Sequence, residues 1–147
     1  MKAVFLAAIL GLAAQVAAAQ DLVRYTTDQS FDDVAFGLEN AILDAGLVVD
    51  HISHVGDMLE RTRETVGSDK VLFTKADVYQ FCSATTSRSV MEANPMNIVY
   101  CPYGIFVAEL ADKPGEVVIG FNKYPEGPMQ EVQALLDGLV KSALGED

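Results

Sequence analysis

The sequence predicts an α+β domain, in which helices pack on one face of a sheet that is at least partly antiparallel. Three observations predict this class. Strand-like segments alternate with amphipathic helical segments along residues 21–143. Two strand-like segments late in the chain are joined directly by a turn at residues 113–116, so they pair as a hairpin. No repeat, low-complexity tract or Pro/Ser-rich linker divides residues 20–147, which are therefore expected to form a single domain.

The first strand and first helix have clear sequence signals. Residues 21–27 (DLVRYTT) are rich in β-branched and aromatic residues and predict a strand. Ser30 is a predicted N-cap, with Asp33 as a variant of the capping box, and Gly46 is a predicted C′ residue. Between them the apolar face of the helix comprises Phe31, Val34, Leu38, Ile42 and Ala45.

The middle of the chain predicts a strand, a short helix and a second extended segment. Residues 47–55 have strand composition, and Gly56 is expected to end that strand. Residues 58–66 predict a short helix closed by Gly67. Residues 71–82 are predicted to be extended, in one or two pieces.

The following segments complete the sheet. Residues 83–94 predict a helix, which must end before Pro95 because a proline disfavours helix in the residue before it. Residues 97–110 predict a strand with a bend, bulge or edge at Pro102. Residues 117–124 predict the partner strand of the hairpin.

The last helix begins at Pro128, a residue that suits the first helical position. The predicted order of elements is therefore β-α-β-(α)-β-α-β-β-α. The apolar stripe of this helix comprises Met129, Val132, Leu135, Leu136, Leu139, Val140 and Ala143.

Residues 1–19 have the pattern of a secretory signal peptide. Lys2 gives a positive start, residues 4–14 form an uncharged apolar run, and residues 17–19 are three alanines. Cleavage is expected after Ala19, which predicts a periplasmic or secreted protein. The apolar run is shorter than the roughly 20 residues that a membrane span needs, and an uncleaved anchor is the alternative.

The charge of the chain excludes classes of partner. The sequence has 10 Lys and Arg against 21 Asp and Glu, a net charge of −11. Loss of Lys2 with the leader makes the mature chain more negative still. Phosphates require Lys and Arg, so nucleic acid is excluded as a partner, as is an anionic membrane surface after cleavage.

With these elements placed, the chain resembles family 302 of the domains of unknown function, over roughly residues 23–139. The resemblance implies a curved, mainly antiparallel sheet with helices on it, similar to the TATA-box-binding-protein-like α+β fold, and carries no catalytic signature. The pair of Cys82 and Cys101 resembles a feature of an exported subgroup of the family. The matching segments are FDDVAFGLENAILDAGL (31–47), MEANP (91–95), NIVYCPYGIFVAEL (97–110) and VVIGF (117–121).

Cys82 and Cys101 are the only cysteines of the sequence. In an exported chain, pairing is the default, so a disulfide is expected. A bridge across about 20 residues stabilises by about 3 kcal/mol in the chain-entropy account. A redox-active pair is the alternative, although neither cysteine lies in Cys-x-x-Cys and the nearest cation in sequence is Arg88.

A metal or haem site is a further alternative. The soft donors Cys82, Cys101 and Met91, with His51 and His54, would suit copper, and a Cys-Pro dipeptide also occurs in some thiolate-haem proteins. No Cys-x-x-Cys-His is present, which excludes covalent c-type haem. In a regular strand the two histidines point to opposite faces, so only a bulge or a turn would let them share an ion.

No G-x-S-x-G, P-loop or H-E-x-x-H motif is present, so no enzyme class is predicted. The leading hypothesis is a non-enzymatic exported domain, without a cofactor, that binds a small ligand or an exported protein partner. The alternative is a redox or metal (copper or haem) carrier that uses the two cysteines with a Met or His. The candidate surface comprises Tyr79, Phe81, Arg88, Met91, Tyr100, Pro102 and Tyr103.

Overall fold

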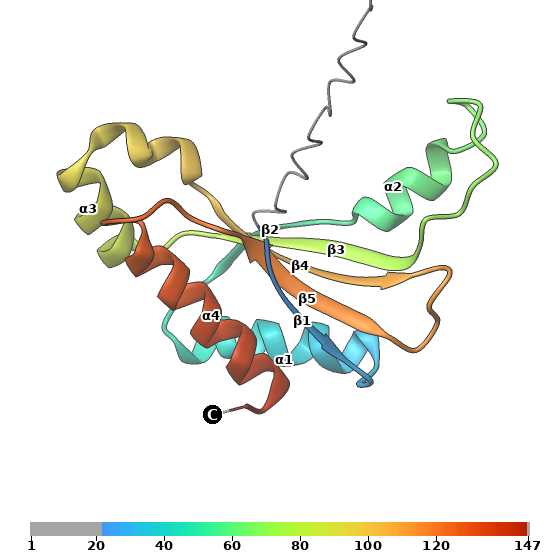
Figure 1. The fold of residues 1–147 in the computed structure, drawn as a ribbon, viewed down its shortest axis with the longest axis horizontal. Coiled ribbons are helices and arrows are strands. Elements are labelled where there is room, and N and C mark those ends of the chain that lie inside the picture. The colour runs from blue at the N-terminus through green and yellow to red at the C-terminus, as the bar shows by residue number, and fades with distance from the viewer. Residues whose placement is uncertain (1–21, 147) are drawn as a thin grey trace, which may run out of the picture.

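The computed structural model describes residues 22–146, so the expected leader over residues 1–19 lies outside the described residues. The chain forms an α+β fold around a five-stranded sheet (Figure 1). Within residues 22–146 no helix is both long and apolar enough to cross a membrane. The elements are β1 (Leu22–Thr27), α1 (Phe31–Asp44), β2 (Val49–Ser53), α2 (Val55–Thr62), β3 (Phe73–Phe81), α3 (Ala84–Ala93), the 3₁₀ helix η1 (Pro95–Tyr100), β4 (Tyr103–Leu110), β5 (Val117–Asn122) and α4 (Gln130–Leu144).

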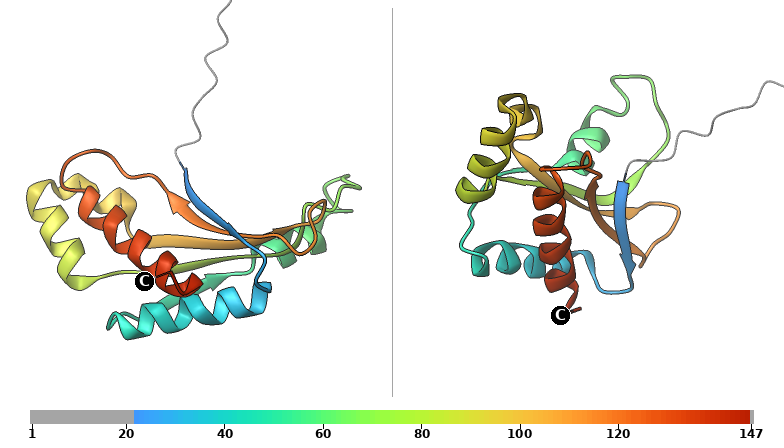
Figure 2. Two further views of the ribbon diagram at one scale, coloured as in Figure 1. Left: turned by 60° about the horizontal axis from the view of Figure 1, so that its bottom comes forward. Right: turned by 60° about the vertical axis from the view of Figure 1, so that its left-hand side comes forward.

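The predicted fold class is confirmed. The strands lie in the order β1-β5-β4-β3-β2, every neighbouring pair is antiparallel, and β4 and β5 form the predicted hairpin. The two long helices α1 and α4 contact each other, crossing at an angle, on one face of the sheet (Figure 2). The side chains between these layers form the core, and the largest fully buried ones include Leu38, Ile105, Ile119 and Leu136.

The predicted helix caps are confirmed at both ends of α1 and at the start of α3. The Ser30 Oγ accepts from the Asp33 backbone N–H at 3.1 Å, and the Ser83 Oγ accepts from that of Thr86 at 3.2 Å. Gly46 follows α1 with φ of 73°, a left-handed conformation that glycine adopts without steric cost. Local hydrogen bonding therefore fixes these helix ends.

The predicted strand over residues 97–110 is wrong in its first part, because β4 begins only at Tyr103. Pro95 occupies the first turn of η1, and the Asn94 side chain caps it by accepting from the Met96 backbone N–H at 3.1 Å. This capped turn overrides the strand preference of the Ile-Val-Tyr run that follows. The bend expected at Pro102 is present, and its peptide bond to Cys101 is cis.

Helix α2 begins at Val55, three residues before the predicted start, so Gly56 lies in its first turn rather than ending the preceding strand. A Cβ at Gly56 would lie 2.7 Å from the Ala76 backbone N, so the glycine allows α2 to lie directly on β3. No residue of α2 is fully buried.

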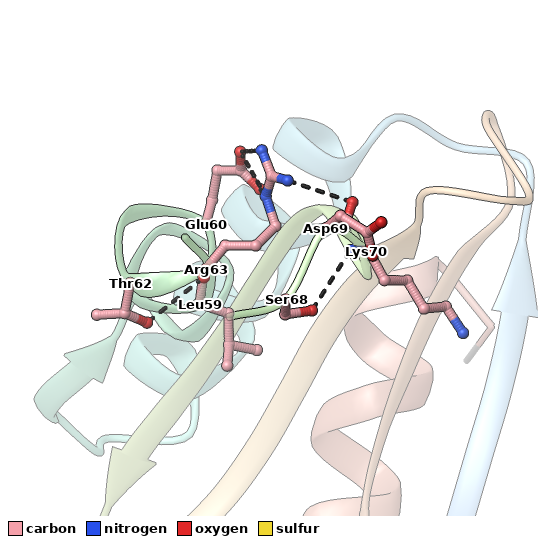
Figure 3. Close-up of polar contacts among 7 residues, drawn as sticks. All are labelled: Leu59, Glu60, Thr62, Arg63, Ser68, Asp69 and Lys70. Atoms are coloured by element: carbon pink, nitrogen blue, oxygen red, sulfur yellow. Dashed lines mark hydrogen bonds and ion pairs between the residues drawn. The ribbon is translucent and has the colours of Figure 1, made fainter. Parts of the chain in front are cut away.

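Polar contacts hold the C-terminal end of α2 to the loop that follows (Figure 3). The Arg63 guanidinium donates to the Glu60 carboxylate at 3.1–3.2 Å and to the Asp69 carbonyl oxygen at 3.2 Å. The Thr62 hydroxyl donates to the Met58 carbonyl oxygen at 2.8 Å. All three contacts are at the surface, and the one between Arg63 and Asp69 joins the helix end to the loop.

Candidate functional site

The sheet face opposite α1 and α4 is apolar along its centre. Successive strand residues point to opposite faces, so Phe106 points away from the core that its neighbours Ile105 and Val107 enter. Val78 and Val118 take the same outward direction from the two flanking strands, and all three outward side chains are half-buried. We call this surface the open face.

Two adjoining hollows lie on the open face and share the side chains of Val78 and Phe106. The first has a volume of about 440 Å³ and extends over Phe73, Val55 of α2 and Arg24 of β1. The second has a volume of about 390 Å³. It is more polar, and its lining includes Gln80, Tyr100, Pro102, Asn122, Lys123 and Tyr124. We call the two together the open groove.

The two cysteines lie together beside the second hollow. The register of Phe81 opposite Tyr103 places Cys82 and Cys101 just beyond the paired ends of β3 and β4. Their Sγ atoms are 3.4 Å apart, and both cysteines carry free thiols. Continued by one residue, the register would place Cys82 opposite Pro102, so Cys101 is offset by one position and the thiols meet through their side chains rather than as a directly opposed pair.

A short polar chain leads from the thiols into the core. The Cys101 Sγ lies 3.5 Å from the Ser87 Oγ, which is 2.9 Å from the buried Tyr103 hydroxyl. Desolvation raises the pKa of Cys82 to about 11, with a further contribution from the Cys101 thiol, although much of the Cys82 residue surface is exposed. Desolvation likewise raises the pKa of Tyr103 to about 12. Both groups are therefore protonated at neutral pH.

Aromatic rings connect the cysteine pair with the groove. Tyr124 packs edge-on against Tyr100 and Tyr103, with ring centroids 5.7 and 6.3 Å apart, and Tyr103 packs against Phe81 at 6.5 Å. Tyr100 and Pro102, the neighbours of Cys101 in the chain, both line the second hollow. Cys101 therefore stands in the chain between two residues of the groove wall.

The structure divides the predicted surface residues into three groups. Tyr79, Phe81 and Tyr103 are buried in the core. Arg88 is exposed on α3 and forms an ion pair with Glu92 at 2.6 Å, while Met91 packs partly buried against the core. Only Tyr100 and Pro102 lie at the open groove.

Of the weak metal candidates, Cys82 and Cys101 contact each other, while the two histidines lie on different parts of the fold. His51 lies on β2, and His54 precedes α2, where its Nδ1 lies 2.8 Å from the Asp77 Oδ1. Among residues 22–146, no three His, Cys, Asp or Glu side chains converge on a point that could hold an ion.

Sequence reasoning located Tyr100 and Pro102 of the open groove but not its apolar floor, because it did not assign the strand residues to the two faces of the sheet. The alternation of polar and apolar residues along the strands contains a signal for this groove. An antiparallel sheet with one solvated face is normally polar at every second position, whereas Val78, Phe106 and Val118 occupy such outward positions. Apolar residues on both faces of central strands indicate a second buried surface or a binding surface.

The fold and the groove together define a class: a small α+β domain whose antiparallel sheet has one face covered by α1 and α4, while on the other face α2 covers one part and leaves the groove open. The chain belongs to the family described as Domain of unknown function DUF302, whose sequence model matches residues 23–138. The comparison with curated proteins gives no match.

A solved structure confirms the fold of the family. It is described as the crystal structure of the uncharacterized conserved protein DUF302 from Bacillus stearothermophilus. The two are 17% identical in sequence and superpose with a TM-score of 0.59, covering 86% of this chain and 90% of the other.

Proposed function

We propose that this chain is an exported binding module that holds a small apolar ligand in the open groove. The observation that carries this proposal is the uncovered apolar hollow over β3 and β4, where the side chains of Val78 and Phe106 floor both parts of the groove. A soluble domain covers such a surface unless a ligand or partner does so, since each buried Å² of apolar surface contributes about 25 cal/mol. Concave, mainly apolar sites with a few polar groups are typical of small-molecule binding.

The proposal includes a disulfide between Cys82 and Cys101 in the mature protein. Support comes from the leader-like residues 1–19 and from the 3.4 Å separation of the two Sγ atoms. The bond would hold Tyr100 and Pro102 in place at the groove wall. The cysteine pair also supports assigning the chain to an exported subgroup of its family, and the open antiparallel sheet supports a TATA-box-binding-protein-like fold.

The redox-carrier alternative has less support. Exchange requires a thiolate, and a Cys82 thiol with a pKa of about 11 is almost fully protonated at neutral pH. No observation in residues 22–146 specifically favours copper or haem over an unmetallated thiol pair.

The binding proposal is tested with the neutral fluorescent probe N-phenyl-1-naphthylamine, whose emission rises in apolar surroundings. The wild-type protein is expected to bind the probe saturably, and Phe106→Ser to weaken binding at least tenfold. Phe36→Ser is the matched control, because Phe36 is 68% exposed on α1, on the covered side of the sheet. No saturable binding by the wild type, or equal loss in both variants, would refute the groove as the site.

A further inference from the structure

The basic side chains of this acidic chain differ in whether they form ion pairs. Among residues 22–146, five of the nine Lys and Arg side chains form ion pairs with carboxylates. The four without such a partner in that range are Arg24, Arg61, Lys70 and Lys123. Two of these, Arg24 and Lys123, line the open groove.

Close packing of β1 on β5 places Arg24 over the groove floor. Arg24 is opposite Gly120 in the strand register. A Cβ at Gly120 would collide with the Val23 carbonyl oxygen and lie 3.1 Å from the Arg24 Cβ, so only glycine permits this approach. The Arg24 side chain therefore starts directly above β5, beside Val118, and its stem covers apolar surface while its charge reaches the rim.

Lys123 lies immediately after β5, at the more polar end of the groove. The side-chain amides of Gln80 and Asn122 line the same hollow and supply neutral N–H donors. Asp77 is the sole acidic residue that lines either hollow, and its carboxylate already pairs with His54 at 2.8 Å. The groove thus combines an apolar floor with two cationic side chains and one carboxylate, and neither cation is in an ion pair within the described residues, in a chain of net charge −11.

We propose that the open groove binds an anionic amphiphile, namely a long-chain aliphatic monocarboxylate. This inference rests on the proposed binding function and adds the class of ligand. The carboxylate lies against Lys123 and the amides of Gln80 and Asn122, and the apolar body extends over Phe106 and Val78 toward Phe73. One ammonium and two amides suit a singly charged head group, since this hollow has no guanidinium to bind a phosphate bidentately.

The test compares dodecanoate, kept below its critical micelle concentration, with 1-dodecanol, kept below its solubility limit, as competitors of bound N-phenyl-1-naphthylamine at pH 7.5. Dodecanoate is expected to displace the probe at about fivefold lower concentration than the alcohol, the gain that one exposed ion pair supplies. Raising the salt from 50 to 500 mM is expected to shrink this preference, because ions screen an exposed pair.

Variants that remove one positive charge test which residues bind the carboxylate of the ligand. Lys123→Gln is expected to abolish the preference for dodecanoate, and Arg24→Gln to reduce it about twofold. Arg61→Gln is the control, because it removes an equally unpaired cation of α2 that lines neither hollow. Equal displacement by the acid and the alcohol would overturn this inference and leave the binding function standing, as would an undiminished preference in Lys123→Gln. Absence of probe binding by the wild type would instead refute the binding function itself.

Discussion

The cysteine pair allows a quantitative test of how the domain is stabilised. Oxidation of Cys82 and Cys101 is expected to raise the melting temperature, because the bond removes conformations of the unfolded chain between two residues that already adjoin in the folded one. The Sγ atoms lie 3.4 Å apart, and the flanking residues Phe81 and Tyr103 are paired, so bond formation requires only small local shifts.

The magnitude follows from loop length. A closed loop of about 20 residues gives an entropic stabilisation of about 3 kcal/mol at 25 °C. For a domain of roughly 125 residues, the unfolding entropy is on the order of 0.26 kcal/mol/K, so the melting temperature should rise by about 12 °C.

The assay is thermal unfolding followed by circular dichroism, on protein whose oxidation state is measured by intact mass after alkylation. The oxidised protein is compared with the same sample treated with a phosphine reductant. Cys82→Ser, Cys101→Ser and the double variant are the controls, and each is expected to melt close to the reduced wild type with no response to reductant.

Two results would refute the reasoning. If both thiols of protein secreted through an oxidising compartment were alkylated in full, the proposed disulfide would be absent. If the bond formed but the melting temperature rose by less than about 3 °C, strain in the folded state would be offsetting the entropic gain, and the short thiol separation would not reflect a good fit for the bond.

Two further predictions concern other parts of the fold. Gly56→Ala is expected to destabilise by about 1–3 kcal/mol and to weaken probe binding, because the new Cβ would lie 2.7 Å from the Ala76 backbone N and push α2 off β3. Gly138→Ala is the control, because no atom lies within 4 Å of its new Cβ, and it should stabilise α4 by about 0.5–1 kcal/mol in chemical denaturation. Equal effects of Gly56→Ala and Gly138→Ala on stability would contradict the packing argument. Ultraviolet titration should show three phenols ionising near pH 12 rather than 10, because burial favours their protonated form. The three phenols are those of Tyr79, Tyr103 and Tyr124, and their contribution to stability is complete below pH 10 and is lost as the pH rises through about 12. The melting temperature should therefore fall over that interval. A normal titration near pH 10 in the folded protein would contradict the burial of these three residues.

The sequence predicts most elements of this fold, because their signals are local. Ser30, Gly46 and Ser83 mark helix ends through hydrogen bonds and backbone angles set within a few residues. The hairpin likewise depends on one turn. The start of β4 could not be placed in this way, because the strand preference of residues 97–100 competes with the turn begun by Asn94 and Pro95, and composition alone does not decide between them.

The candidate site was harder to predict than the fold. The proximity of Cys82 and Cys101 follows from the pairing of β3 with β4, whereas the sequence suggested a bond between them only through the expected oxidising compartment. The groove depends instead on which face the helices leave uncovered. That is decided by the packing of α1 and α4 on one face and by how far α2, seated through Gly56 on Ala76, extends over the other, contacts between residues distant in sequence. Side chains such as Phe106 therefore look like core residues until the layers are assembled.

The two ends of the described domain have different surroundings. Leu22, the first residue of β1, lines the open groove, whereas α4 ends at Leu144 on the covered side of the sheet, beside α1 (Figure 1). A tag, fusion partner or surface linker attached next to Leu22 would crowd the rim that ligands must cross. Attachment after Leu144 would hold the domain by its opposite side and present the groove to solution. Immobilised or fused forms of this protein should therefore be tethered through the carboxyl end.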